Sequence, residues 1–349
     1  MQTLRRVVAV AFLAGALTVM GLAVPAGAGD GGGIACGTSI TQNTTLTQDL
    51  GCPSTAIRFG ADNITLNLNG FRVFRTGEGN CDCPGIHVLN RQGDSIVNGT
   101  VQGFSTGIYL EGGGRHTISG VIARDNVGLL SGNTLFGEGI QLFESNNNRI
   151  VNSQMIRNGT FSGINLYDSS GNVVQSNNVA QNNILQVNAS HGGPRIMQDI
   201  GIWVISLSSA GLSRNNQIIG NSVTQNGLDG IQVSRFSVMN TVTGNTATGN
   251  GFGQVPGIRD GDGIAVFGVN NLFQSNSANR NAGNGIGVRA PGTQVGPGNR
   301  LFRNNAFGNN AGPNQQANFD LFDASPNCDG NIWSGNQGIT FSPPCTRNP

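Results

Sequence analysis

The chain has no lysine, few aromatic residues and little charge, and these shortages limit its function. All 19 cationic residues among its 349 are arginines, and only 11% of the residues are charged. The formal net charge of +1 becomes −1 when Arg5 and Arg6, at the start of the chain, are subtracted. Such a chain offers no basic field for nucleic acid or for anionic lipid. We therefore expect no nucleic-acid partner.

Long hydrophobic runs are missing beyond the first 28 residues. There, Arg5 and Arg6 precede an apolar run over residues 7–24, and Ala26-Gly27-Ala28 follows. This layout predicts a bacterial-type signal peptide over residues 1–28, cleaved near Ala28, and hence a protein that is secreted or associated with the cell wall. No later stretch approaches the roughly 20 apolar residues that cross a bilayer, so we expect no membrane span.

The six cysteines lie toward the two ends of the mature chain, and export favours their pairing as disulfides. Proximity in sequence favours Cys36 with Cys52, and Cys328 with Cys345. The close spacing of Cys81 and Cys83 leaves two alternatives, a strained local disulfide or two free thiols. Only three histidines are present, and none has zinc-finger spacing to the cysteines.

A Gly-Ile pair followed by alternating residues recurs eight times at intervals of 22 to 38 residues. The copies begin at Gly85, Gly107, Gly139, Gly163, Gly201, Gly230, Gly263 and Gly285. A second short apolar segment follows each copy, as at residues 148–151, and a third ends in asparagine, as at residues 179–182. Three short strands per repeat cannot bury their apolar faces alone and must stack on neighbouring repeats. The pattern predicts an all-β, single-stranded right-handed parallel β-helix, with asparagines hydrogen-bonded from coil to coil at the turns.

The opening and closing segments add to this pattern. The opening runs from Cys36-Gly37-Thr38-Ser39-Ile40 to Cys52 and through residues 61–70, and the closing runs from Cys328 through Trp333 to Cys345. Together with the repeat they resemble the pectin-lyase-like superfamily of right-handed parallel β-helix repeat proteins, in particular bacterial exported members of unassigned activity. We predict disulfide-stapled caps at 29–56 and 326–349 on either side of the β-helix at 57–325, because solenoid ends expose strand edges.

In each Gly-Ile strand the isoleucine and the residue two later point inward, so the residues between and after them form two outward rows. These rows and their flanks hold aromatic, amide and arginine side chains that suit stacking and hydrogen bonding to sugars. The predicted polysaccharide-binding residues are Tyr109, Gln141, Phe143, Asn165, Tyr167, Trp203, Gln232, Arg235, Phe267 and Arg289. The alternative is that exposed aromatic residues simply favour strands.

Acidic residues gather beside the same strands, namely Glu111, Glu138, Glu144, Asp168, Asp199, Asp229, Asp260 and Asp262. Asp229 and Asp262 directly precede the glycines of their coils, and neighbouring coils would bring them together. Such a pair could share a proton, bind Ca²⁺, or act as acid and nucleophile in glycoside cleavage. The segment from Arg259 and Asp260 to Asp262 is the best single candidate for a catalytic site. The alternative is that Asp-Gly forms a turn whose carboxylate caps backbone N–H groups.

The resemblance implies a polysaccharide partner, and its members differ in their catalytic groups. Pectate-lyase-like members use an arginine base with Ca²⁺ held by carboxylates, another lyase group uses a lysine base, and polygalacturonase-like hydrolases use three aspartates. The lack of lysine argues against the second group, and the hydrolase motifs are absent. We expect a monomer that interacts with, and by elimination or hydrolysis cleaves, an acidic polysaccharide. The alternative is a non-catalytic carbohydrate-binding or cell-surface structural β-helix protein.

Overall fold

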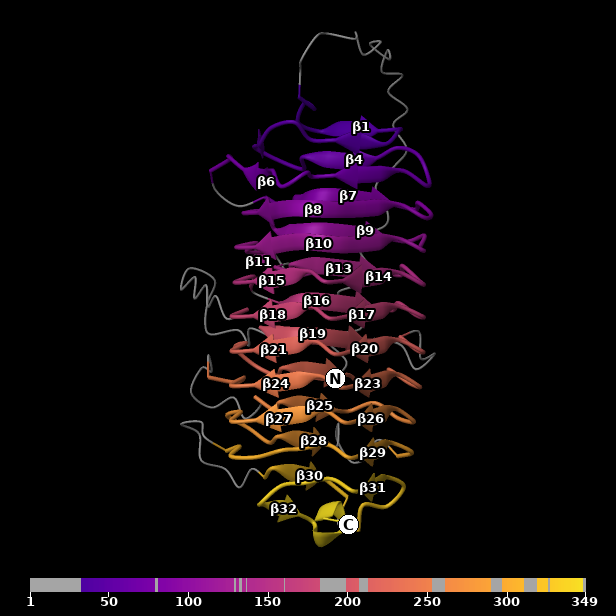
Figure 1. The fold of residues 1–349 in the computed structure, drawn as a ribbon, viewed down its shortest axis with the longest axis vertical. Coiled ribbons are helices and arrows are strands. Elements are labelled where there is room, and N and C mark those ends of the chain that lie inside the picture. Colours follow the sequence, from indigo (N-terminus) through magenta and orange to yellow (C-terminus); the bar gives the residue numbers. More distant parts are fainter. Residues whose placement is uncertain are drawn as a thin grey trace.

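The eight Gly-Ile segments form consecutive strands of one parallel sheet, which confirms the repeat. The computed structural model describes residues 33–78, 81–128, 130–131, 134–135, 137–159, 161–182, 199–206, 213–252, 261–289, 297–310, 319–325 and 327–347. Within these ranges the chain winds into a tall stack of coils, with its sheets running along the stack (Figure 1). The predicted signal peptide lies outside the described residues.

The strands form three parallel ladders, and a typical coil, such as the one that contains residues 140–156, contributes one strand to each. The first sheet has 12 strands within the described ranges. They are β1 (Thr38–Ile40), β4 (Ile57–Phe59), β7 (Pro84–Leu89), β9 (Thr106–Glu111), β13 (Ile140–Phe143), β16 (Ser162–Tyr167), β19 (Ile200–Ile205), β22 (Ile231–Val233), β25 (Ile264–Val266), β28 (Ile286–Val288), β30 (Leu321–Asp323) and β32 (Phe341–Ser342). The sequential order of these strands along the sheet is that of a solenoid.

The second and third ladders share the two long strands β8 (Ser95–Gln102) and β10 (Thr117–Arg124). The rest of the second ladder is β2 (Thr44–Thr45), β5 (Thr65–Asn67), β14 (Arg149–Val151), β17 (Val173–Gln175), β20 (Gln217–Ile219), β23 (Thr241–Thr243), β26 (Leu272–Gln274), β29 (Arg300–Phe302) and β31 (Ile332–Ser334). The rest of the third is β3 (Leu50–Cys52), β6 (Arg72–Arg75), β15 (Gln154–Ile156), β18 (Asn178–Ala180), β21 (Ser222–Thr224), β24 (Thr246–Thr248) and β27 (Ser277–Asn279).

Buried asparagines hydrogen-bond from coil to coil at the corners, as the sequence predicts. At the corner between the second and third ladders, each amide nitrogen donates to the amide oxygen of the next coil at 2.9 to 3.0 Å. This ladder consists of Asn177, Asn221, Asn245, Asn276, Asn304 and Asn336. A residue in the left-handed region precedes each member, for example Ser176 with φ 55° before Asn177. That turn aims the amide inward, where an unpaired polar group would be costly.

From Gly107 onward, the glycine of each Gly-Ile pair packs against a second asparagine ladder. A Cβ on Gly230 would lie 2.6 Å from the carbonyl oxygen of Gly263 and 2.7 Å from the amide nitrogen of Asn250. Asn250 belongs to a ladder of Asn126, Asn158, Asn182, Asn226, Asn250, Asn281 and Asn309. The repeat therefore keeps glycine where backbone and amides pack closest.

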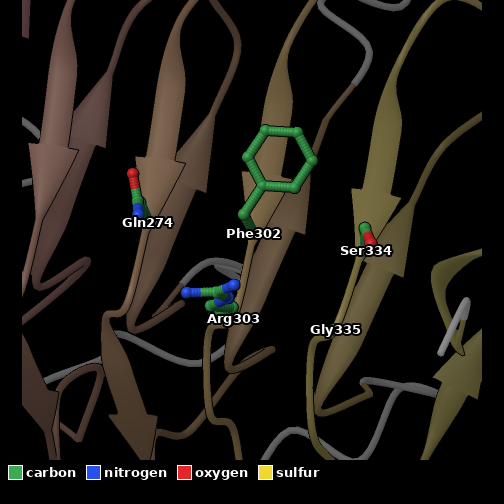
Figure 2. Close-up of a pocket in the computed structure, with 5 residues that line it drawn as sticks. All are labelled: Gln274, Phe302, Arg303, Ser334 and Gly335. Carbon is green, nitrogen blue, oxygen red and sulfur yellow. The ribbon is translucent and has the colours of Figure 1, made fainter.

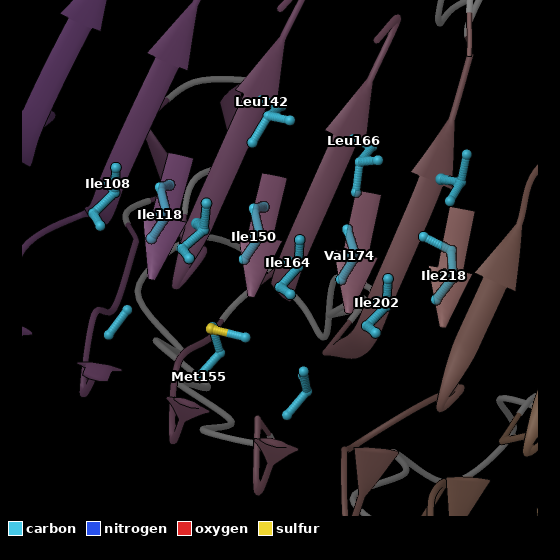
Figure 3. Close-up of a cluster of buried hydrophobic side chains, with 14 of the residues drawn as sticks. Ile108, Ile118, Leu142, Ile150, Met155, Ile164, Leu166, Val174, Ile202 and Ile218 are labelled. Carbon is cyan, nitrogen blue, oxygen red and sulfur yellow. The ribbon is translucent and has the colours of Figure 1, made fainter. Parts of the chain in front are cut away.

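Aliphatic side chains fill the interior in rows that run from coil to coil along the stack (Figure 3). Ile108, Ile164 and Ile202 point inward from the first sheet and are fully buried. Ile118 and Ile150 face them from the second ladder, and Met155 comes from the third. Burial of each such side chain contributes roughly 1.5–3 kcal/mol, so the stacked rows hold neighbouring coils together.

Disulfides close the two ends of the stack. Cys36 is bonded to Cys52 and Cys328 to Cys345, as predicted. Cys81 is bonded to Cys83, the first of the two alternatives that the sequence left open. The first sheet already begins at β1 and extends to β32, so strand stacking enters both segments that we assigned to caps.

The described residues also include a two-stranded antiparallel pair, β11 (Leu130–Ser131) and β12 (Thr134–Leu135). A short 3₁₀ helix, η3 (Pro344–Arg347), follows β32 near the C-terminus. Nowhere in the described ranges is a helix both long and apolar enough to cross a membrane.

Candidate functional site

The two outward rows predicted on the first sheet are in register. The first row runs over consecutive strands through His87, Tyr109, Gln141, Asn165, Trp203, Gln232, Ala265 and Gly287. The second runs in the ladder through Leu89, Glu111, Phe143, Tyr167 and Ile205. Neighbouring members of a row are about 4.8 Å apart along the stack. Further down, Ser234, Phe267 and Arg289 lie just past the ends of β22, β25 and β28.

His87, Tyr109 and Glu111 form a contact cluster on strands β7 and β9. The imidazole Nε2 of His87 lies 2.9 Å from a carboxylate oxygen of Glu111, and both side chains are partly exposed. The His87 ring stacks on that of Tyr109, with centroids 5.1 Å apart and an interplanar angle of 4°. A histidine oriented by a carboxylate can accept or donate a proton. His87 and Glu111 lie diagonally across the two neighbouring rows. That spacing is visible in the sequence and could have revealed the pair, which our predicted site omitted.

Phe143 and Tyr167 form a second aromatic pair, on strands β13 and β16. Their ring centroids are 5.0 Å apart, and both side chains are partly buried. Burial raises the pKa of Tyr167 to about 12, with added contributions from the carboxylates of Asp168 and Glu144. Burial likewise raises the pKa of Tyr109, followed by the carboxylate of Glu111. The field around both phenols is therefore negative.

The middle of the first row is buried, which corrects our expectation that the whole row faces solvent. Gln141 is 7% exposed, Asn165 0% and Trp203 4%. Trp203 packs against Phe161, with ring centroids 4.8 Å apart, and its indole nitrogen donates to the hydroxyl of Ser234 at 2.6 Å. It belongs to a second apolar cluster, separate from the solenoid core, made of Ile200, Trp203, Ile205 and Leu228. An amphipathic indole gains more from burial with its N–H paired than from exposure.

Asp229 and Asp262 lie on adjacent coils, since the amide of Gly230 donates to the carbonyl of Asp262 at 2.9 Å. One carboxylate oxygen of Asp229 accepts the backbone N–H groups of Gly261 and Asp262, at 3.0 and 2.8 Å. The carboxylate of Asp262 accepts two hydrogen bonds from the guanidinium of Arg289, at 2.8 and 2.6 Å.

The amide of Asn284 also donates to Asp262, at 3.0 Å. The carboxylates of Asp229 and Asp262 therefore already accept hydrogen bonds, as the turn-capping alternative predicts. Their catalytic role stays a prediction. Among the described residues no group of three or more His, Cys, Asp or Glu side chains is arranged to hold a metal ion.

Burial raises the pKa of two other acidic groups beside the first sheet. Burial raises the pKa of the Glu138 carboxyl to about 7, against stabilising hydrogen bonds from Gly137 and Thr106. Burial raises the pKa of the Asp199 carboxyl to about 8. Both lie beside the first sheet, since Glu138 comes shortly before β13 and Asp199 directly precedes β19. Perturbed carboxyls of this kind concentrate at binding and catalytic sites.

The remaining predicted residues are scattered along the lower half of the face. The amide of Gln232 is 3.4 Å from the hydroxyl of Ser234, and Phe267 is partly buried. The guanidinium of Arg235 lies over the ring of Phe236, 5.1 Å from its centroid. Arg259 and Asp260 lie outside the described residues.

A shallow hollow occurs on a different side of the solenoid, over β26, β29 and β31 of the second ladder (Figure 2). It has a volume of about 320 Å³ and is lined by Gln274, Phe302, Arg303, Ser334 and Gly335. None of the predicted site residues lines it. The predicted face and this hollow are therefore separate surfaces.

Solved structures with the same architecture extend over most of this chain. The pectate lyase Pel9A superposes with a TM-score of 0.56 at 13% sequence identity, over 85% of this chain and 80% of its own. The Dettilon tailspike protein gp208 gives a TM-score of 0.51 at 15% identity over 86% of this chain. The superposition covers 50% of the tailspike chain, so this protein spans half the length of that relative. At such identities the likeness shows the fold.

Sequence comparison with protein families agrees with the fold. No curated protein matches the sequence. The family model described as a right-handed β-helix region matches residues 80–267, which is more than half of the chain. That segment contains seven of the eight Gly-Ile strands, from β7 to β25. The protein therefore belongs to the right-handed β-helix family, and its all-β, right-handed parallel β-helix fold is confirmed.

Proposed function

We propose that this protein binds a polysaccharide on the outer face of strands β7, β9, β13 and β16. The main support is a pair of ring contacts on four consecutive strands, His87 with Tyr109 and Phe143 with Tyr167. Aromatic faces provide apolar platforms for sugar rings, and the carboxylate of Glu111 between them can accept hydrogen bonds from sugar hydroxyls. The strands fix the spacing of these groups, so a repeating ligand meets a pre-formed surface.

The charges of this face favour a neutral glycan over the acidic one expected from the sequence. Glu111, Glu144 and Asp168 lie close enough to the two phenols to raise their pKa. Among the described residues, the cations of the first row near these strands are Arg58, next to His87, and His87 itself if protonated. His87 is already engaged by Glu111. A polyuronate would place its carboxylates among like charges, whereas hydroxyls would find acceptors.

Cleavage of the bound chain is a second candidate function, and the His87–Glu111 pair favours it. A partly exposed imidazole held 2.9 Å from a carboxylate has the arrangement of a general base with its orienting group. In hydrolysis it would take a proton from water, and in elimination from the carbon next to a uronate carboxylate. The centre predicted from Arg259, Asp260, Asp229 and Asp262, with its Ca²⁺, remains a competing proposal, although Arg289 already engages Asp262.

Two further observations support a polysaccharide partner outside the cytoplasm. One structural neighbour is a pectate lyase. Three disulfides hold this chain, and such bonds persist in oxidising compartments. We propose a secreted, monomeric protein in agreement with the predicted signal peptide.

The test is a binding and cleavage screen of the purified mature protein against neutral glycans, polygalacturonate, alginate and hyaluronan, with and without Ca²⁺. Binding is read by affinity electrophoresis, elimination by new absorbance at 235 nm, and hydrolysis by reducing ends. We expect retention on a neutral glycan. Cleavage that is lost in His87→Gln but kept in Asp262→Asn would assign the reaction to His87. Retention on no glycan would reject the proposal, and retention on polyuronates alone would reject its neutral-ligand part.

A further inference from the structure

Four buried polar side chains on the coils of β13 and β16 leave most of their oxygen atoms without a hydrogen-bond partner. Glu138, Ser162 and Asn165 are 0% exposed, and Gln141 is 7% exposed. The unpartnered atoms are Glu138 Oε1, Gln141 Oε1, Ser162 Oγ, Asn165 Oδ1 and Asn165 Nδ2. Groups like these are normally satisfied, so their accumulation at one place indicates a missing binding partner.

The four side chains are neighbours in space. Gln141 and Asn165 are adjacent in the first row, and the amide of Gly139, next to Glu138, donates to the carbonyl of Ser162 at 3.2 Å. Asn165 lies close enough to Glu138 to lower its pKa, although no well-formed hydrogen bond joins the two. The other oxygen of Glu138 is occupied by the hydroxyl of Thr106 and the amide of Gly137, both at 3.0 Å. Glu138 Oε1 is thus held in place without a partner.

A second coil of the same protein shows one way in which a buried carboxylate at this position is neutralised. Asp262 precedes Gly263 just as Glu138 precedes Gly139, and Asp262 reaches over the first row of the next coil. A Cβ on Gly287 in that row would lie 2.5 Å from Asp262 Oδ2. There the buried carboxylate is neutralised by the guanidinium of Arg289, at 2.6 Å.

Among the described residues, no such cation pairs with Glu138. In the coil after it, the position that corresponds to Arg289 is Tyr167. A buried carboxylate without a counter-charge is costly, because burial removes the water that would stabilise the charge. Within the described ranges the site therefore lacks one positive charge.

We propose that Glu138, Gln141, Ser162 and Asn165 bind a single hard divalent cation, Ca²⁺, beneath the outer face of the first sheet. Carboxylate, amide and hydroxyl oxygens are the ligands that Ca²⁺ takes in proteins. The burial of all four side chains excludes a sugar from these oxygens. A water molecule would supply two hydrogens to the oxygens but no charge to Glu138. With one carboxylate among the ligands, the dissociation constant falls in the range of about 10⁻⁴–10⁻³ M seen in extracellular modules.

The site is independent of glycan binding, and its test needs no substrate. The full mature protein is stripped with EDTA and titrated with Tb³⁺, whose luminescence is sensitised through Trp203, the neighbour of Asn165 in the row. Ca²⁺ should displace Tb³⁺, and 10 mM Ca²⁺ should raise the Tm by about 2–6 °C. Glu138→Gln, which keeps the shape of the side chain, should abolish both responses. The control Glu144→Gln, an exposed carboxylate on the same coil, should keep them.

Three results would overturn the proposal. The first is a Tm that does not respond to Ca²⁺ up to 10 mM, which would leave water or a protonated Glu138 at this site. The second is an unchanged Ca²⁺ response in Glu138→Gln, which would place the ion elsewhere. The third is loss of the response in Glu144→Gln alone. If Glu138→Gln does not fold, Asn165→Leu provides the same comparison, because it removes one ligand oxygen and no charge.

Discussion

His116 takes the place of an asparagine in one of the corner ladders. Its Nδ1 accepts the backbone N–H of Asp94 at 3.1 Å, and its own backbone N–H donates to the amide oxygen of Asn148 at 2.9 Å. The ring is 2% exposed, and its Nε2 has no hydrogen-bond partner. Burial lowers the pKa of His116 to about 4 and raises the pKa of Asp94 to about 6. The imidazole therefore fills a position that the following coils fill with an amide.

Replacement of His116 by asparagine should stabilise the protein increasingly as the pH falls. The unfolded chain binds a proton at His116 below about pH 6.5, whereas the folded chain does so only near pH 4. The wild type therefore loses stability between these values, by up to about 3 kcal/mol, and His116→Asn does not. Urea unfolding of both proteins at pH 7 and pH 4.5 measures the difference. If the wild type and His116→Asn differ in their free energy of unfolding by the same amount at both pH values, this account is contradicted.

The sequence could tell which residues point outward on the first sheet, but not which of them stay exposed. The period of two fixes the direction of Tyr109, Asn165 and Trp203. Their burial depends on packing from outside the sheet, such as the contact of Trp203 with Phe161. In contrast, the repeat alone was enough to place Asp229 and Asp262 on adjacent coils. The bond that Arg289 makes to Asp262 depends on side-chain reach and was not predicted.

At the scale of the strand and its turn, the Gly-Ile signature was sufficient to find every coil from β7 to β28. The signature succeeded because any residue larger than glycine would clash with the neighbouring coil, and because the isoleucine side chain fills the core. The continuous strands β8 and β10, each eight residues long, departed from the expected three strands per coil. Their coils have no corner asparagine between the second and third ladders, where the ladder begins only at Ser153 and Asn177.

Glycines in two kinds of position should respond differently to alanine. Gly230→Ala places a Cβ against the backbone oxygen of Gly263 and the ladder amide of Asn250, so a backbone shift or a broken ladder is unavoidable. We expect a loss of about 3 kcal/mol or more. Gly220 has φ 59° and open space where a Cβ would lie, so Gly220→Ala should cost only about 1–2 kcal/mol. Chemical denaturation of both variants checks the order, and equal losses would refute the role given to the asparagine ladder.

For the whole molecule, the buried carboxyls set the pH dependence of stability. Burial raises the pKa of Asp94 to about 6, of Glu138 to about 7 and of Asp199 to about 8. Each folded-state pKa exceeds the unfolded value of about 4, so the folded state binds more protons and stability is lost as the pH rises through these values.

In EDTA, the Tm should therefore be highest near pH 5 and fall toward pH 8.5, while His116 limits stability on the acid side. Asp199→Asn should flatten the decline above about pH 7. Thermal unfolding followed by circular dichroism across this range provides the profile. A Tm that is constant or rises from pH 5 to pH 8 would show that these carboxyls are not desolvated as described.

The first sheet and the second ladder lie on different sides of the stack. An aromatic residue on the second ladder can therefore serve as a matched control for the binding proposal. Tyr109 and Tyr167 lie on the outer face of the first sheet, whereas Phe302 lines the hollow over the second ladder (Figure 2). An exposed aromatic residue that stacks on a sugar contributes enough that its loss weakens binding by about tenfold. An aromatic residue on another side of the solenoid contributes nothing.

The most direct measurement is the affinity of wild type, Tyr109→Ala, Tyr167→Ala and Phe302→Ala for one soluble neutral polysaccharide, by isothermal titration calorimetry. All four proteins are first compared by circular dichroism to establish the same fold. We predict that each tyrosine variant binds about tenfold more weakly and that Phe302→Ala binds as the wild type does. Unchanged affinity in both tyrosine variants, or a loss confined to Phe302→Ala, would contradict a polysaccharide site on the first sheet.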